Sequence, residues 1–471
     1  MSEKGKEVIH QYFEQLAAKR ERWRKRNWFY HRTLEKQYRM IIPEGSSVLE
    51  IGCGTGDLLN SVKPSAGFGI DFSSGMIERA RAKYPGLTFY HANAEDFACG
   101  IQFDYVILSD LLSSLWDIQV VIRNLRNLIH PRTKIIISSY SYFWEPALRF
   151  GEWIGLKARQ PLQSWLTVSD ISGLLNIEEF EIVKVERKLL LPIYIPVINL
   201  IFNTFIANLP GFNRLCLINM ITARPLFRKH EQYSVTIVVP ARNEKGNIEN
   251  AIKRTPAFGT HQEFIFIEGF SRDQTWEEIL RVRDAYPGKD IKALKQTGKG
   301  KGNAVREAFE QATGEILMIL DADLTTPPED MPKFYEALSR NRGEFINGCR
   351  LVYPMDKEAM RFLNFLANKF FGWFFSYILG QRLKDTLCGT KVLFKKDYEL
   401  IKSNRKYFGD FDPFGDFDLI FGAAKLNLKI TEVVVRYRDR EYGSTQISRF
   451  RHGILLIRMS LFAARKIKFT R

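Results

Sequence analysis

Short apolar strands alternate with helical stretches in this sequence, and the alternation occurs twice along the chain. In the first half, strands are expected at residues 48–51, 67–71, 105–108, 134–139 and 180–187. A second series begins at residues 234–240, directly after a basic stretch that contains Pro225. Strands that alternate with helices form a parallel sheet covered by helices. The sequence therefore predicts two doubly wound α/β domains, residues 1–225 and 233–471, joined by a linker at 226–232.

The size and charge of the chain restrict the class of protein and the kind of partner that we expect. With 471 residues it is too long for one hydrophobic core, and 45% hydrophobic with 26% charged residues is typical of globular domains. A formal net charge of +16 favours an anionic partner, such as phosphate groups or acidic lipid. The basic run at residues 20–26 is accompanied by no nucleic-acid-binding motif, so no nucleic acid partner is expected.

The cysteines indicate a reducing compartment. All five lack CxxC spacing, and no apolar signal segment opens the chain. We expect a cytoplasmic protein that binds no metal through cysteine.

Residues 189–209 form an uncharged, mostly apolar run that is long enough to be considered as a membrane span. Two prolines and three asparagines within it disfavour a span, which would also separate the two domains across a membrane. We expect an insertion in the first domain, residues 189–213, that either receives a lipidic or bulky acceptor or packs between domains.

A glycine-rich turn follows the first strand. Gly52, Gly54 and Gly56 come directly after Glu50 and Ile51, so the backbone there can approach a ligand closely. Their spacing differs from the GxGxxG pattern of dinucleotide-binding oxidoreductases.

Two further loops belong to the same edge of the predicted sheet. Asp71 ends the second strand, where a carboxylate can accept the hydrogens of two ribose hydroxyl groups. Residues 91–97 follow a further strand-like run, and Asp110 closes the strand expected at 105–108.

Together these motifs resemble class I S-adenosylmethionine-dependent methyltransferases over residues 40–185. The resemblance implies that S-adenosylmethionine binds at Glu50, Gly52, Gly54, Gly56, Asp71, Asn93, Ala94 and Glu95. The methyl acceptor stays open, since no residue stands out as a general base. A domain that binds the cofactor only as a scaffold or sensor is the alternative.

The second series resembles glycosyltransferase family 2, whose fold is of the GT-A type, over residues 234–448. The resemblance rests on the strand and polar turn at 238–244, on the acidic loop at 268–275 and on the basic glycine-rich loop at 298–304, which can present amide and ammonium groups to phosphate. It implies nucleotide-sugar binding by Pro240, Arg242, Glu244, Glu268, Asp273, Lys301 and Asp321.

Asp321 and Asp323 follow an apolar strand at 316–320. Two aspartates in this arrangement can share one Mg²⁺ or Mn²⁺ ion, which neutralises a diphosphate leaving group. We expect a metal site and catalytic roles at both residues.

Within the family, the resemblance is greatest to dolichol- and polyprenyl-phosphate sugar transferases. It implies that Arg350, Arg361 and Lys391 bind an acceptor phosphate, and that Asp385, Asp418 and Arg440 take part in catalysis. A soluble glycan is the alternative acceptor.

Two segments of the second domain suggest contact with an anionic membrane. Polar residues recur every three or four positions in 361–379 and leave a broad aromatic surface, and residues 447–469 mix apolar and basic side chains as an interfacial helix does. We expect a peripheral protein on the cytosolic face of a membrane; core packing or dimerisation is the alternative reading of both segments.

Overall fold

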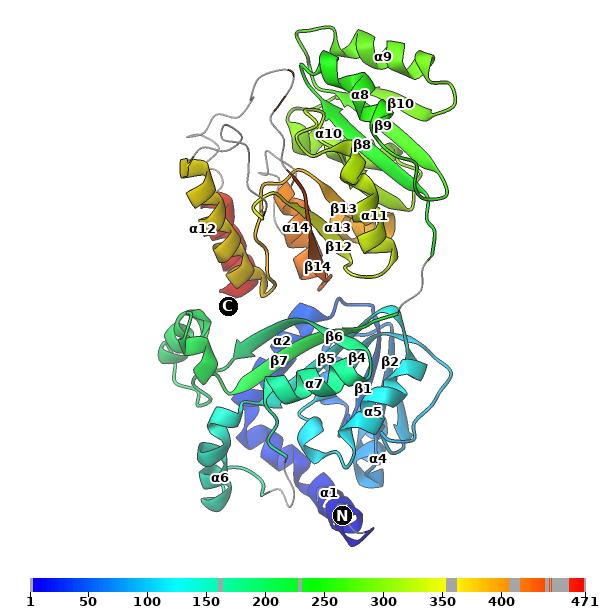
Figure 1. Cartoon of the computed structure of the whole chain (residues 1–471). Coiled ribbons are helices and arrows are strands. Elements are labelled where there is room, and N and C mark those ends of the chain that lie inside the picture. Colours follow the sequence, from blue (N-terminus) through cyan, green and yellow to red (C-terminus); the bar gives the residue numbers. More distant parts are fainter. Residues whose placement is uncertain are drawn as a thin grey trace. The chain divides into compact units, whose positions relative to one another are not determined.

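The computed structural model describes residues 3–159, 164–227, 231–352, 362–405, 416–436, 440, 442 and 457–469. The chain divides into two compact units, residues 1–227 and residues 228–470 (Figure 1). Residues 228–230 of the predicted linker lie outside the described residues. Each unit is described by itself.

The first unit is built on one seven-stranded sheet with the order β3-β2-β1-β4-β5-β7-β6. The strands are β1 Ser47–Ile51, β2 Ala66–Asp71, β3 Thr88–His91, β4 Phe103–Ser109, β5 Ile129–Tyr140, β6 Phe180–Lys188 and β7 Ile218–Pro225. Strands β1 to β5 are parallel, whereas β7 is antiparallel to both β5 and β6. The predicted α/β sheet is confirmed, and the antiparallel strand β7 makes it a mixed sheet.

Helices cover both faces of this sheet, because successive strand residues point to opposite sides. Val48 packs with Tyr38 of α2 on one face, and Leu49 packs with Leu175 of α7 on the other. The helices are α1 Glu3–Arg26, α2 Trp28–Ile41, α3 Asp57–Ser61, α4 Ser74–Lys83, α5 Ile118–Asn124, α6 Glu145–Trp153 and α7 Val168–Ile177.

The apolar stretch from residue 189 connects β6 to β7. Two asparagines hold its backbone: Leu191 N donates to Asn203 Oδ1 (2.8 Å), and Asn199 Nδ2 donates to Ile193 O (2.8 Å). Many of its apolar side chains are exposed, including Ile193 and Val197. Within the described part of the chain, no helix is long and apolar enough to cross a membrane.

The second unit also has one seven-stranded sheet, with the order β10-β9-β8-β11-β13-β12-β14. Its strands are β8 Val235–Ala241, β9 Gln262–Glu268, β10 Asp290–Lys295, β11 Ile316–Ile319, β12 Phe345–Cys349, β13 Lys391–Phe394 and β14 Ile430–Val434. Strands β8 to β11 are parallel, and β13 runs antiparallel to β11 and β12. The turns after β8, β9 and β11 therefore meet at one edge of the sheet.

Seven α-helices are described around this sheet. They are α8 Ile248–Lys253, α9 Thr275–Ala285, α10 Lys301–Gln311, α11 Met331–Ser339, α12 Phe362–Leu379, α13 Lys395–Ser403 and α14 Asp416–Lys425.

The aromatic surface expected for α12 is divided between the core and the exterior. Phe371 and Phe375 are buried in the hydrophobic cluster beside α14, whereas Phe370 and Trp373 are exposed. Ser376, which belongs to the polar stripe of the sequence, bonds to Leu383 instead of facing solvent. The C-terminal residues 457–469 pack beside α12 and are divided in the same way (Figure 1). Arg361 and residues 447–456 lie outside the described residues.

Candidate functional sites

The glycine-rich turn of the first unit is a tight backbone loop after β1. Gly52, Gly54 and Gly56 all have positive φ, which L-residues with side chains rarely adopt. A Cβ atom at Gly52 would overlap the Leu111 side chain, and one at Gly56 would overlap Phe89. Gly54 has only the Arg20 side chain near its Cβ position, at 4.0 Å. Its backbone is therefore open to a ligand.

Asp71 lies beside this turn at the end of β2. Its Oδ2 accepts a hydrogen bond from Gly54 N (2.9 Å) and its Oδ1 accepts one from Ser73 N (3.0 Å). Burial raises the pKa of the carboxyl. Each oxygen keeps one acceptor position, so the orientation is fixed while two hydroxyl groups can still be bound.

The other predicted cofactor residues lie on the neighbouring strands and loops. Glu50 is buried in β1, where burial raises its pKa well above its ordinary value, and its Oε2 has no hydrogen-bond donor. Asn93 Oδ1 accepts a bond from Glu95 N (3.2 Å) in the loop after β3, and Ala94 packs against the core below. All eight predicted residues thus belong to strands β1 to β3 or to the loops that follow them.

Sequence reasoning did not assign roles to Tyr30 of α2 and to Asp110, which follows β4; the two side chains form a partly buried pair. Tyr30 OH donates to Asp110 Oδ2 (2.5 Å), and Ser138 Oγ donates to Asp110 Oδ1 (2.9 Å). Burial raises the pKa of Asp110, which also has a positive φ of 53°. Asp110 lines a cavity with Tyr140 and Trp165. Tyr30 comes from α2, 80 residues earlier, so no local pattern could have revealed the pair.

In the second unit, each predicted metal-binding aspartate has a cationic partner. Lys301 Nζ lies 2.6 Å from Asp321 Oδ1, and Arg440 Nη2 lies 2.6 Å from Asp323 Oδ2. Burial raises the pKa of Asp321, but the charges of Lys301 and of nearby basic residues outweigh it and hold the pKa below its ordinary value. No cluster of three or more His, Cys, Asp or Glu side chains suited to a metal ion occurs among the described residues.

Arg440 also reaches the turn after β8. Its Nη1 lies 3.4 Å from Glu244 Oε1, and burial raises the pKa of Glu244 to about 7. The neighbouring Tyr442 ring lies against Gly246, and its hydroxyl group is 3.5 Å from Asp273 Oδ2. Glu244, Asp273, Asp323 and Arg440, all predicted from the sequence, therefore lie together. Tyr442, two residues after Arg440, was given no role from the sequence.

The remaining predicted donor-binding residues surround the same edge. Pro240 lies in β8 beside Ile267, and Arg242 is exposed in the turn that follows. Glu268 ends β9, where its side chain accepts a bond from Ser271 N.

The glycine-rich basic loop is held by Glu307 of the helix that follows it and by Gln296, which precedes it. Glu307 of α10 accepts bonds from Thr297 N (2.9 Å) and Gly298 N (3.2 Å), and Gln296 Nε2 donates to Gly300 O (2.8 Å). These bonds fix the start of α10 and hence Lys301 beside Asp321.

Two of the residues predicted to bind the acceptor, Arg350 and Lys391, are largely buried. Arg350 forms a two-pronged ion pair with fully buried Asp385, at 2.7 and 2.8 Å. Burial raises the pKa of Asp385, but the Arg350 charge outweighs it and lowers the pKa. Lys391 is fully buried, with its Nζ donating to Cys388 O. A Cβ atom at Gly389 would overlap Asp321 Oδ2, so this loop lies directly against the first aspartate.

Asp418 lies near the start of α14 beside two arginines. Its Oδ2 is 3.5 Å from Arg405 Nε and 3.7 Å from Arg306 Nη1. Its role in catalysis, like the acceptor roles of Arg350, Arg361 and Lys391, stays a prediction.

Comparison with known proteins identifies two families. Residues 236–399 match the family model described as glycosyl transferase family 2, and residues 49–135 match a methyltransferase domain. The chain is 33% identical over 137 residues to a dolichol-phosphate mannosyltransferase of Pyrococcus furiosus, which covers 29% of this chain and 38% of the relative. The chain spans only 33–44% of the length of the first curated relatives that it matches.

Solved structures resemble each half. A SAM-dependent methyltransferase of Thermotoga maritima is 16% identical, covers 45% of this chain and 98% of its own, and gives a TM-score of 0.37. Glucosyl-3-phosphoglycerate synthase of Mycobacterium tuberculosis is 17% identical, covers 51% of this chain and 81% of its own, and also gives 0.37.

Proposed function

Because the chain carries a methyltransferase domain followed by a glycosyltransferase family 2 domain, we propose that it is a bifunctional transferase. The second unit transfers a sugar from a nucleotide-sugar donor to a polyprenyl-phosphate-like acceptor. The first unit transfers a methyl group from S-adenosylmethionine to a separate acceptor.

The observation that carries the glycosyltransferase proposal is the set of alternating charges around β11. Asp321 and Asp323 are paired with Lys301 and Arg440 at 2.6 Å each, at the edge where the turns after β8 and β9 also end. A divalent cation on the two aspartates, Mg²⁺ or Mn²⁺, would neutralise the diphosphate leaving group. Lys301 and Arg440 would then bind donor phosphate oxygens through charge-assisted hydrogen bonds.

A phosphate acceptor does not require a strong general base from the protein. The oxygen of a phosphate monoester is already anionic at neutral pH, so it can attack without a strong general base. The similarity to a dolichol-phosphate mannosyltransferase supports such an acceptor.

The test is sugar transfer by the full chain with a panel of nucleotide sugars and a short polyprenyl phosphate. Asp323→Ala, or removal of divalent cations by a chelator, is expected to lower transfer at least about 100-fold, as removal of a group that stabilises transition-state charge does. Asp284→Ala changes an exposed aspartate of α9 and serves as the matched control. Transfer at the full rate by Asp323→Ala would exclude this metal site.

The methyltransferase proposal rests on how well the first unit fits the cofactor. The open backbone at Gly54 suits the methionine moiety, and the fixed carboxylate of Asp71 suits the two ribose hydroxyl groups. S-adenosylmethionine would supply an activated methyl group there. Asp110, which follows the neighbouring strand β4, and Tyr30 of α2 can hold or accept a proton from the acceptor.

Release of S-adenosylhomocysteine in the presence of lipid and glycan extracts tests this activity. Tight cofactor binding without product would instead favour a scaffold or sensor role for this domain.

We also propose that the protein binds peripherally to the cytosolic face of a membrane. Phe370 and Trp373 of α12 are exposed, and Ile457 and Leu461 are exposed near the basic side chains of the C-terminal segment. Apolar and basic side chains together bind anionic lipid surfaces.

Flotation with liposomes tests the membrane proposal. The full chain is expected to float with anionic liposomes at low salt, and Trp373→Ser with Leu461→Ser is expected to reduce flotation. A wild-type protein that stays unbound would leave a soluble glycan as the acceptor.

A further inference from the structure

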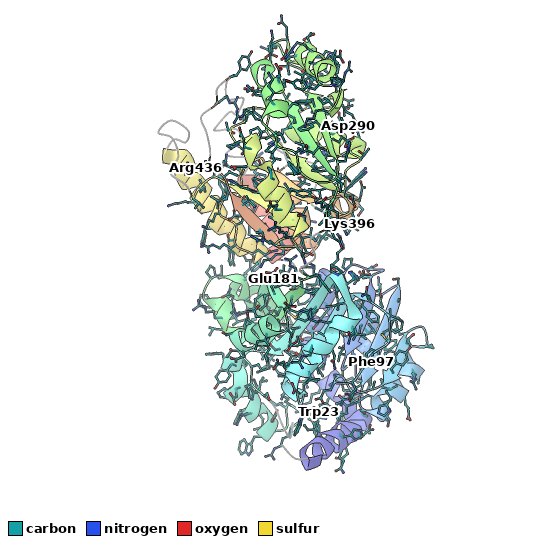
Figure 2. The ribbon with its side chains drawn as sticks, turned by 45° about the vertical axis from the view of Figure 1, so that its right-hand side comes forward. Trp23, Phe97, Glu181, Asp290, Lys396 and Arg436 are labelled. Atoms are coloured by element: carbon teal, nitrogen blue, oxygen red, sulfur yellow. The ribbon has the colours of Figure 1, made fainter. Side chains whose placement is uncertain are left out.

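The basic run at residues 20–26 lies in the last turns of α1 and not in an exposed arm. Trp23, labelled in Figure 2, marks this part of the helix. Arg24 forms ion pairs with Glu35 of α2 and with Asp57 of α3. Arg26 lies over the Trp23 ring. Arg24 and Arg26 therefore make contacts within the first unit.

Contacts along α1 hold it against the edge where the cofactor residues gather. Glu14 accepts bonds from Ser74 N (2.7 Å) and Gly75 N (3.2 Å) at the start of α4. Phe13 packs edge-on against Phe72, with ring centroids 5.3 Å apart, directly after Asp71. The helix therefore covers the strand end that carries the predicted ribose ligand.

Arg20 is the residue of α1 that faces the glycine-rich turn. Its Nε lies 4.0 Å from the Cβ position of Gly54, and nothing else comes that close to this position. Across the described ranges, Arg20 has neither a hydrogen bond nor an ion pair. Burial raises the pKa values of Asp71, Glu50 and Asp110, and the charge of Arg20 opposes this effect only in part. A half-buried guanidinium with this position and no direct partner is suited to an anionic ligand group.

The neighbouring side chains and the chemistry of the cofactor indicate which ligand group Arg20 would bind. Glu50, Asp71 and Asp110 are carboxyl groups whose pKa values are raised by burial, so none of them suits an anionic ligand group, whereas the Arg20 guanidinium beside Gly54 does. The one anionic group of the cofactor is its α-carboxylate, which belongs to the methionine moiety that the glycine-rich turn would hold.

We propose that Arg20 binds the α-carboxylate of the cofactor through its guanidinium fork, so that α1 closes over the methionine moiety. This inference rests on the proposed methyltransferase function. An arginine and a carboxylate can form two parallel hydrogen bonds, which a lysine cannot reproduce.

The test compares two ligands by calorimetry on the full chain. S-adenosylhomocysteine carries the carboxylate, whereas 5′-methylthioadenosine lacks the whole amino-acid end. Arg20→Ala is expected to weaken binding of S-adenosylhomocysteine at least about tenfold, as loss of a charged hydrogen bond does, and to leave 5′-methylthioadenosine within about twofold of wild type. Arg20→Lys is expected to lie between. Arg22→Ala, an exposed neighbour on the same helix, is the matched control.

The outcomes distinguish a failure of the proposed role of Arg20 from a failure of the proposed methyltransferase function. Unchanged affinity for S-adenosylhomocysteine in Arg20→Ala, or equal weakening of both ligands, would overturn the role of Arg20. A wild-type protein that binds neither ligand would instead overturn the proposed methyltransferase function, and this inference with it.

Discussion

Arg440 bridges two carboxylates, with its Nη2 2.6 Å from Asp323 Oδ2 and its Nη1 3.4 Å from Glu244 Oε1. The three residues are far apart in sequence, since 117 positions separate Arg440 from Asp323 and 196 separate it from Glu244. A segment near the C-terminus therefore completes a site whose other parts lie in the first strands of the same unit.

Arg440→Ala is expected to lower sugar transfer at least about tenfold, because each charge-assisted hydrogen bond contributes about 1.5–3 kcal/mol. Arg440→Lys keeps the charge but cannot reach both carboxylates with one rigid fork, so its activity should be intermediate. The measurement is kcat/KM for the nucleotide sugar. Methyl transfer by the same preparation is the internal control, and equal losses in both activities would point to a folding defect.

The pH dependence of stability tests the environment of Glu244. Its pKa is raised to about 7 from an ordinary value of 4.5, mainly by burial. Between these pH values the unfolded chain has lost the proton that the folded chain keeps, so this group lowers stability as pH rises. Relative to Glu244→Gln, the wild type should lose at most about 3 kcal/mol across this window. Thermal unfolding of both proteins at pH 5, 6 and 7 measures the difference. Parallel curves would contradict the raised pKa.

Gly389→Ala should damage the glycosyltransferase site without unfolding the protein. The new methyl group would overlap Asp321 Oδ2 and lie about 2.5 Å from Lys301 Nζ, and both are the ends of side chains that can move. We expect normal thermal unfolding and a loss of sugar transfer of at least about tenfold, as expected when catalytic groups are displaced. Gly288→Ala, where a Cβ atom meets nothing within 4 Å, should be unchanged. Full activity in Gly389→Ala would show that the loop moves away during the reaction.

Asp71→Asn should weaken binding of S-adenosylhomocysteine and of 5′-methylthioadenosine alike, because both ligands contain the ribose. We expect at least a tenfold increase in each dissociation constant, about 1.4 kcal/mol, from the loss of charged acceptors. Calorimetry measures both constants. Asp96→Asn, an exposed aspartate in the loop after β3, is the control. A variant that binds only one ligand more weakly would contradict the ribose assignment.

The sequence revealed the parts of both sites that lie on single strand ends. Gly54, Asp71 and Asp321 each follow an apolar strand directly, so parallel pairing alone was enough to bring each beside its neighbours.

Long-range contacts were missed, since periodicity does not tell which helix covers which edge. Tyr30 reaches Asp110, and Arg20 reaches Gly54, only because α1 and α2 pack onto the sheet. The sequence of α12 also does not tell which of its aromatic side chains face the core. Phe375 is buried and Trp373 is exposed, although both belong to the same aromatic pattern.

Strands β6 and β7 are adjacent and antiparallel, paired from Phe180 with Pro225 to Lys188 with Ile218. In terms of topology, the apolar stretch between them is the loop of a β-hairpin, and the sheet constrains only its two ends. The predicted cofactor residues belong to β1, β2 and the loops after β1 to β3, so the connection from β6 to β7 can differ in length without a change in the strands that carry them.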